Sequence, residues 1–124
     1  MFAAQFEKVA RVAGSPEYMA PESIRSSVEP GRAHLVDLYA LGIVAFQLLV
    51  GTVPFTGKSA GEVLPQHLND APPDLAKLRA DTPPELSALV KSLLSKDPDG
   101  RPQDCEEVLW ELRAARVRLR PKPR

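Results

Sequence analysis

Histidine and cysteine, the residue types most often used for metal binding and nucleophilic catalysis, are scarce in this 124-residue chain. The two histidines, His34 and His67, are too few and too far apart in sequence to predict a metal site, since such sites need several ligands. His67 is interpreted as a partly exposed helical residue. Cys105 is the single cysteine, which excludes an internal disulfide and fits a reducing compartment. We interpret it as a small buried apolar group and not as a nucleophile.

Two further residues are placed where their chemistry needs an explanation. Asp37 lies within the apolar run 35–50, where a carboxylate is costly unless it accepts hydrogen bonds. Taken by itself, it is interpreted as a cap near the start of a helix. Ser15 lies between Gly14 and Pro16, and its simplest interpretation is an ordinary turn residue.

Residues 14–22 (GSPEYMAPE) predict a loop that is held in one shape. Pro16 and Pro21 each remove a backbone donor and restrict the preceding residue, which argues against a continuous helix. Tyr18 and Met19 are apolar bodies that need cover, which argues against a flexible linker. A loop held in this way usually positions a functional group.

The rest of the chain predicts an all-α fold with long connecting loops. Residues 35–50 are apolar on nearly every face, which predicts a helix buried all round that stops at Gly51. Gly42, in the interior of this helix, indicates close backbone packing. No stretch of the sequence shows a convincing strand pattern.

Three more helices are predicted from caps and from apolar spacing. Ser59 and Glu62 have capping-box spacing and predict a helix over residues 59–69, kinked or delayed by Pro65. Thr82 is the predicted cap of a helix over 83–96, which follows an irregular stretch. The last helix begins near residue 103, and its predicted buried residues are Val108, Leu109 and Leu112.

Composition and charge bound the possible classes of protein. Apolar residues make up 44% of the chain, the net charge is zero, and the order of residues typical of a signal peptide is absent from the start. The longest apolar run contains Asp37 and is shorter than the roughly 20 residues of a membrane span. We therefore expect no membrane span in this chain and a cytoplasmic location.

The charge is unevenly distributed along the chain. The last residues contain six basic side chains and no acid, and the remainder has 10 basic against 16 acidic residues, a net charge of −6. The segment 114–124 is interpreted as a basic tail or linker. An anion-binding role toward nucleic acid or lipid is the weaker interpretation, and we expect no nucleic-acid partner. The basic residues are Arg113, Arg116, Arg118, Arg120, Lys122 and Arg124.

Four motifs in order resemble the C-terminal lobe of a eukaryotic-type Ser/Thr protein kinase. Residues 14–22 resemble the end of its activation segment, which carries an Ala-Pro-Glu step. Residues 37–42 (DLYALG) resemble the start of the family's central buried helix, and residues 51–55 (GTVPF) resemble the loop after it. Residues 97–102 (DPDGRP) resemble the turn before the family's last helix. Residues 66–68 (QHL) and 71–73 (APP) further resemble the bacterial branch of the family. The resemblance covers about residues 10–113.

The resemblance implies a substrate-docking loop made by Gly14, Ser15, Pro16 and Tyr18. In Ser/Thr kinases the hydroxyl at the position of Ser15 faces the catalytic aspartate, near the substrate hydroxyl. By the same resemblance, Asp37 accepts hydrogen bonds from the backbone of the catalytic loop and anchors that loop on the central helix.

The resemblance also implies a buried structural ion pair between Glu22 and Arg101. Arginine suits this position because its planar guanidinium can hold a carboxylate through two hydrogen bonds. One departure from the family is that Leu35 and Val36 stand where a polar pair usually precedes the aspartate.

Phosphoryl transfer needs parts that this sequence does not contain. The sequence has no Gly-rich phosphate loop, no His-Arg-Asp base and no Asp-Phe-Gly metal ligand. No catalytic or metal-binding residue is therefore assigned in this chain, and ATP and Mg²⁺ are expected only for an intact parent kinase. Whether the chain is an enzyme is left open.

The first hypothesis is a C-terminal lobe fragment of a Ser/Thr protein kinase, not catalytic alone. Its organisation would be the end of an activation segment over 1–22, a helical core over 23–113 and the tail over 114–124. The alternative is a non-catalytic, kinase-like module that binds a partner protein. In either case the partner is a protein, and the isolated chain is predicted to be marginally stable and to expose apolar surface.

Overall fold

The computed structural model describes residues 15–119, and within that range it contains helices and no strand. The predicted all-α class is therefore confirmed. Gly14, the first residue of the predicted docking loop, lies outside the described residues. The elements are η1 (Pro16–Tyr18), α2 (Pro21–Ile24), α3 (Ala33–Val50), α4 (Ala60–Asn69), α5 (Leu75–Leu78), α6 (Pro84–Leu93), η2 (Pro98–Gly100) and α7 (Cys105–Leu119).

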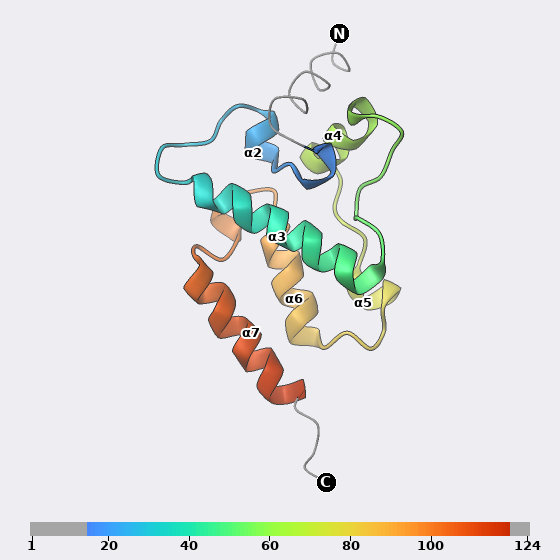
Figure 1. Ribbon diagram of the computed structural model, residues 1–124, viewed down its shortest axis with the longest axis vertical. Helices are drawn as coiled ribbons and strands as arrows, with labels where there is room; N and C mark the ends of the chain where they lie inside the picture. Colours follow the sequence, from blue (N-terminus) through green and yellow to red (C-terminus); the bar gives the residue numbers. More distant parts are fainter. Residues whose placement is uncertain (1–14, 120–124) are drawn as a thin grey trace.

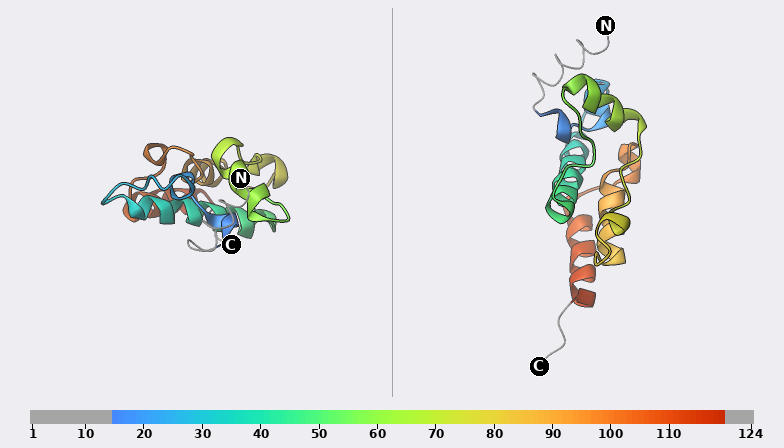
Figure 2. Two further views of the ribbon diagram at one scale, coloured as in Figure 1. Left: turned by 90° about the horizontal axis from the view of Figure 1, so that it is seen from above. Right: turned by 90° about the vertical axis from the view of Figure 1, so that its right-hand side faces the viewer.

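Helix α3 runs through the middle of the molecule, with α2 and α4 at one side and α6 and α7 at the other (Figure 1). In the right-hand view of Figure 2, α3 and α7 lie in one layer and α5 and α6 in a second. Side chains from both layers meet in the core, where Tyr39, Ile43 and Phe46 of α3 contact Leu75, Val90 and Leu94. Helix α3 is therefore the scaffold on which the other elements are placed.

Gly42 brings α3 and α6 close together. A Cβ atom at this position would lie 2.8 Å from Cβ of Leu93 and 3.0 Å from Cδ2 of Leu94. The predicted close packing at this glycine is therefore observed, and its partner is α6. At the end of the helix, Gly51 has a φ of 99°, a left-handed conformation that favours glycine, and its N–H donates to the carbonyl of Gln47.

The caps of the shorter helices differ from the prediction. Helix α4 begins after Ser59 and continues through Pro65, but the carboxylate of Glu62 accepts from the N–H of Lys58 instead of closing a box on Ser59. Helix α6 is preceded by Pro83 and not capped by Thr82, whose hydroxyl is buried without a partner among the described residues. At α4 a competing local hydrogen bond replaces the predicted capping box, whereas at α6 the predicted cap residue Thr82 is buried.

Two connecting segments also differ from expectation. The stretch predicted to be irregular contains the short helix α5, whose first N–H groups are capped because the Asp74 carboxylate accepts from the N–H of Ala76. Helix α7 continues to Leu119, past the boundary expected after residue 113. The segment expected to be a tail or linker is therefore helical over its first residues.

The predicted buried face of α7 is only partly correct. Val108 is buried against α3 and α6, but Leu109 and Leu112 are exposed, and Trp110 is 72% exposed. Ala115 is the other buried residue of this helix among those described. The helix is thus held along a narrow stripe and leaves apolar side chains uncovered.

The composition of the central helix predicted burial on all sides, and this prediction is wrong. Leu41, Val44 and Leu48 are exposed on one face of α3, and Leu48 is 79% exposed. By length and composition alone, α3 is the one helix among the described residues that could cross a membrane. Its other face packs in the protein core.

Candidate functional site

The candidate site begins with a single turn of 3₁₀ helix, η1. Ser15 precedes this turn in an extended conformation and is exposed. The N–H of Tyr18 donates to the carbonyl of Ser15 at 3.3 Å, and the N–H of Met19 donates to that of Pro16 at 3.3 Å. Because Pro16 fixes its own φ, the turn needs few contacts to keep its shape. The segment is a rigid loop with an exposed hydroxyl at its start.

Tyr18 fastens this loop to the central helix. Its hydroxyl donates to Oε1 of Gln47 on α3 at 2.6 Å, and its ring packs against the core around Tyr39. Met19 and Ala20, which follow, are buried. The loop is therefore held from below by α3 and α4, both of which pack against η1.

Glu22 and Arg101, 79 positions apart, form a buried bidentate ion pair. Nη1 of Arg101 donates to Oε2 of Glu22 at 2.5 Å and Nη2 donates to Oε1 at 2.8 Å. The Arg101 side chain is 0% exposed. The structure thus brings together the two groups that the family resemblance paired, one in α2 and one in the turn before α7.

The remaining donors of Arg101 are also used. Nη1 donates to the carbonyl of Leu35 at 2.9 Å and Nε donates to that of Ser95 at 2.9 Å. The guanidinium carbon lies 5.0 Å from the centre of the Tyr39 ring. A buried guanidinium needs such complete pairing to offset its desolvation. Arg101 therefore ties α2, the start of α3 and the turn before α7 to one point.

The charge of Glu22 is maintained by this arrangement. Burial acts to raise the pKa of Glu22, but the hydrogen bonds and the positive charge of Arg101 act more strongly in the opposite direction. The pKa of Glu22 consequently lies below its usual value. The Glu22 carboxylate is therefore ionised at neutral pH.

Below the loop lies a cluster that sequence reasoning missed. His67 of α4 is fully buried, which corrects the expectation of a partly exposed residue. Its Nδ1 is 2.6 Å from the hydroxyl of Tyr39, and its ring makes edge contacts with Tyr39 and Phe55. The ammonium of Lys96 lies over the Phe55 ring, 4.3 Å from its centre. The signal that could have found it is helical spacing, because His67 continues the apolar face of α4 that Ala60, Val63 and Leu64 form.

Asp37 is exposed, and it makes no hydrogen bond or ion pair with any residue between 15 and 119. The alternative interpretation as a helix cap is wrong, because α3 begins after Arg32 and Asp37 lies further along the helix. Asp37 instead lies on the same exposed face of α3 as Leu41, Val44 and Leu48, at the N-terminal end of that face. An exposed acid on an apolar face is suited to accept hydrogen bonds from a segment that covers this face.

The other candidate residues have ordinary environments. Nε2 of His34 lies 2.8 Å from the carbonyl of Gln103 on the surface. Cys105 is exposed at the start of α7, which corrects the expectation that it is buried. In the described part of the chain, no group of three or more His, Cys, Asp or Glu side chains could hold a metal ion.

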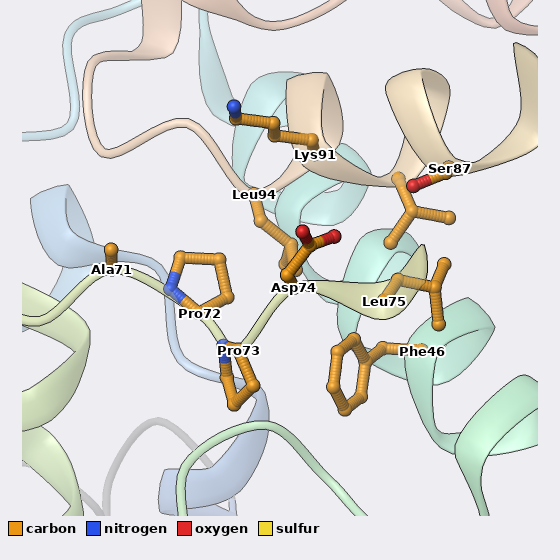
Figure 3. Close-up of a pocket in the computed structure, with 10 residues that line it drawn as sticks. Phe46, Ala71, Pro72, Pro73, Asp74, Leu75, Ser87, Lys91 and Leu94 are labelled. Atoms are coloured by element: carbon orange, nitrogen blue, oxygen red, sulfur yellow. The ribbon is translucent and has the colours of Figure 1, made fainter. Parts of the chain in front are cut away.

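A cavity of about 240 Å³ lies beside the core, between α3, α6 and the segment before α5. In Figure 3, Pro73 and Phe46 lie on one side of this space and Lys91 and Ser87 on the other. Asp74 at its rim is engaged in capping α5. The cavity is separate from the docking loop and shares none of its residues.

A helical lobe in which a proline-bounded loop is tied by a buried Glu–Arg pair to a turn before the last helix defines a class, the large lobe of the protein kinases. The family model for the protein kinase domain matches residues 2–111, and the chain belongs to this family.

Its similar relatives include bacterial Ser/Thr kinases. The chain is 38% identical over 118 residues to the serine/threonine-protein kinase pkn3 of Myxococcus xanthus. It is 36% identical over 105 residues to PknB of Mycolicibacterium smegmatis and 32% identical over 104 residues to PrkC of Bacillus subtilis. These matches cover 91%, 85% and 84% of this chain but only 21%, 16% and 16% of the three relatives.

Proposed function

We propose that the chain is the substrate-docking part of a bacterial Ser/Thr protein kinase, which transfers phosphate from ATP to protein hydroxyls only when the remaining catalytic parts are supplied. The observation that carries this proposal is the docking loop held rigidly by α3, α4 and the Glu22–Arg101 pair. Catalysis of phosphoryl transfer depends mainly on positioning and charge neutralisation, so a preformed loop is a useful contribution.

The residues of this chain do not by themselves fit ATP and Mg²⁺. The sequence has no phosphate-binding glycine loop, and the described residues offer no cluster of metal ligands. We therefore assign both ligands to another segment of the kinase. A cytoplasmic location and a protein substrate belong to the same proposal.

The exposed face of α3 is the proposed contact for that segment. Asp37 would accept backbone hydrogen bonds from the catalytic loop, and Leu41, Val44 and Leu48 would be covered by the helix that precedes it. Such cover removes apolar area from water, worth about 25 cal/mol per Å². An exposed acid beside exposed leucines is explained by one partner that meets both.

Complementation in trans tests the proposal. The kinase segment of pkn3 that ends before the match to this chain is mixed with the chain, ATP, Mg²⁺ and a Ser-containing acceptor protein. We expect no transfer from either part alone and measurable transfer from the mixture. Arg101→Ala should abolish it, whereas Arg79→Ala, which removes an exposed ion pair with Asp81 and an exposed hydrogen bond to the carbonyl of Leu49, should not.

The same experiment separates the second candidate, a non-catalytic module that binds a partner protein. The exposed apolar face of α3 favours this candidate equally, because it needs only a covering partner. Tight binding of the pkn3 segment without phosphate transfer would support the module and reject the catalytic proposal. Neither binding nor transfer would reject both. ATP binding by the chain alone would contradict the assignment of ATP to another segment.

A further inference from the structure

His67 is buried directly beneath the docking loop, and no role has so far been given to it. The residue is 0% exposed, on a helix that packs against η1. The Phe55 ring lies edge-on with a centre distance of 4.9 Å, and the Tyr39 ring lies edge-on at 5.5 Å. The imidazole ring therefore has a fixed orientation. Its two nitrogens face different neighbours.

The first nitrogen is paired, and the second lacks a well-formed bond. Nδ1 lies 2.6 Å from the hydroxyl of Tyr39. Nε2 is buried and has no hydrogen-bond partner of good geometry among the described residues. A buried polar nitrogen without a partner is uncommon and requires an explanation.

The backbone of the docking loop is the nearest candidate for that partner. Burial, and then the charge of Lys96, lower the pKa of His67 to about 4, while the backbone of Pro16 and Glu17 acts in the opposite direction. Pro16 has no N–H, so its backbone can favour the protonated ring only as an acceptor. Because α4 packs against η1 and Nε2 is buried, the carbonyls of this turn are the nearest acceptors to which that nitrogen can be assigned. At neutral pH the ring is uncharged and has a single N–H.

Tyr39 determines which nitrogen holds that proton. Burial raises the pKa of Tyr39 above its usual value, so its hydroxyl keeps its proton. If this hydroxyl donates to Nδ1, the N–H of the ring is on Nε2 and faces the loop carbonyls. The opposite tautomer would set the lone pair of Nε2 against carbonyl oxygens and leave the tyrosine proton without an acceptor. The arrangement favours the Nε2–H tautomer.

We infer that His67 is a positioning residue, whose buried Nε2–H is directed at the backbone carbonyls of Pro16 and Glu17 and bonds to them in solution, and so fixes the shape of the substrate-docking loop. The inference rests on the proposed function for the meaning of the loop, but not for the contact itself. Burial, and after it the charge of Lys96, keeps the ring neutral; Lys96 lies over Phe55 and donates to the carbonyl of Gln66. His67 would therefore affect phosphate transfer through the shape of the loop and not through contact with the reacting atoms.

The contact is tested on the whole chain by NMR, without any activity measurement. Long-range ¹H–¹⁵N spectra of the His67 ring should show the neutral Nε2–H tautomer at pH 7. In His67→Phe, which keeps an aromatic ring but removes both nitrogens, exchange of the hydrogen-bonded amides of Tyr18 and Met19 should be faster by about tenfold. In His67→Gln, whose amide nitrogen reaches the position of Nε2, exchange should return to within about twofold of the wild type.

Two controls separate the hydrogen bond from simple packing. His34→Gln changes the surface histidine and should leave loop exchange unaltered. The double variant Tyr39→Phe with His67→Phe also removes the tyrosine hydroxyl. It therefore reports loop exchange when no buried Tyr39 hydroxyl is left without its hydrogen-bond partner. An Nδ1–H tautomer, or loop exchange in His67→Phe within about twofold of His34→Gln, would overturn the inference. Should His67→Phe fail to fold, the tautomer and the Gln variant still decide.

The complemented kinase adds a second readout. A positioning role predicts that His67→Phe raises KM for a peptide substrate by about tenfold with little change in kcat, and that His67→Gln restores it. An equal fall in kcat and kcat/KM would contradict this role. If no complementation is obtained, the proposed function fails, but the tautomer and exchange measurements still test the contact independently.

Discussion

Glu22 and Arg101 join segments that are distant in sequence, so this pair has the largest expected effect of a single substitution. Arg101→Ala would leave a buried carboxylate without its guanidinium, and we expect a loss of about 3–5 kcal/mol in the free energy of unfolding. Urea denaturation followed by circular dichroism measures it. The matched control is Arg79→Ala, because the Arg79–Asp81 pair is exposed and should change stability by less than about 1 kcal/mol. Equal effects of the two variants would contradict the assigned importance of the buried pair.

His67 predicts a specific dependence of stability on pH. Its pKa is lowered from 6.5 to about 4 by burial and by Lys96, so the unfolded chain binds a proton more readily than the folded one. Its contribution is fully present above pH 6.5 and is lost as the pH falls toward 4, by roughly 3 kcal/mol in total. Urea midpoints between pH 7 and 4 measure this loss.

The His67→Phe variant is the control for this pH dependence. It should flatten the curve between pH 6.5 and about 4, leaving the decline at lower pH that comes from protonation of Glu22. The pKa of Glu22 is lowered, so its contribution is present above its ordinary pKa and is lost at more acid pH. A variant curve that follows the wild-type curve throughout would show that His67 is not the titrating group.

At the scale of the elements, the contact between α3 and α6 depends on the missing side chain of Gly42. Gly42→Val would place a Cβ atom 2.8 Å from Cβ of Leu93. Because Cβ of Leu93 is bonded directly to the backbone, rotation of the leucine side chain cannot relieve this clash. We expect a destabilisation of about 1–3 kcal/mol from overpacking. Thermal denaturation measures it, with Ala33→Val at the exposed start of the same helix as the control. A neutral result for Gly42→Val would mean that the two helices separate without cost.

Helix positions in this chain follow local signals, but helix faces do not. The apolar run and Gly51 predicted α3 closely, and Pro83 and Pro84 predicted the start of α6, because these signals act on neighbouring residues. The exposed faces of α3 and α7 were not predicted, because a face is buried only by what packs on it. Leu109 and Leu48 read as core residues from sequence and are exposed in the structure.

At the scale of the whole molecule, we expect the uncovered apolar face of α3 to cause self-association of the isolated chain. Leu41→Gln with Leu48→Gln should reduce dye binding and self-association of the isolated chain, because both leucines are exposed and apolar. The same pair should weaken binding of the complementing kinase segment, while changing the free energy of unfolding by less than about 0.5 kcal/mol each. Analytical ultracentrifugation and a fluorescence dye titration measure these effects.

Lys77→Gln with Lys91→Gln is the matched control for this double variant, since both lysines are exposed and lie on other helices. It should leave association and dye binding unchanged. A double leucine variant that associates as the wild type does would show that another surface, such as that around Trp110, is responsible.

By itself the sequence determined the family, the all-α class and the order of the four motifs, because these depend on residue types at short spacing. Only the tertiary structure decided the hydrogen bonds that complete Arg101, the burial of His67 and the face of α3 that is left uncovered. The physical reason is that each of these depends on which distant segments meet. The spacing of Ala60, Val63 and Leu64 places His67 on the apolar face of α4, but its contacts with Tyr39, Phe55 and η1 come from segments elsewhere in the chain.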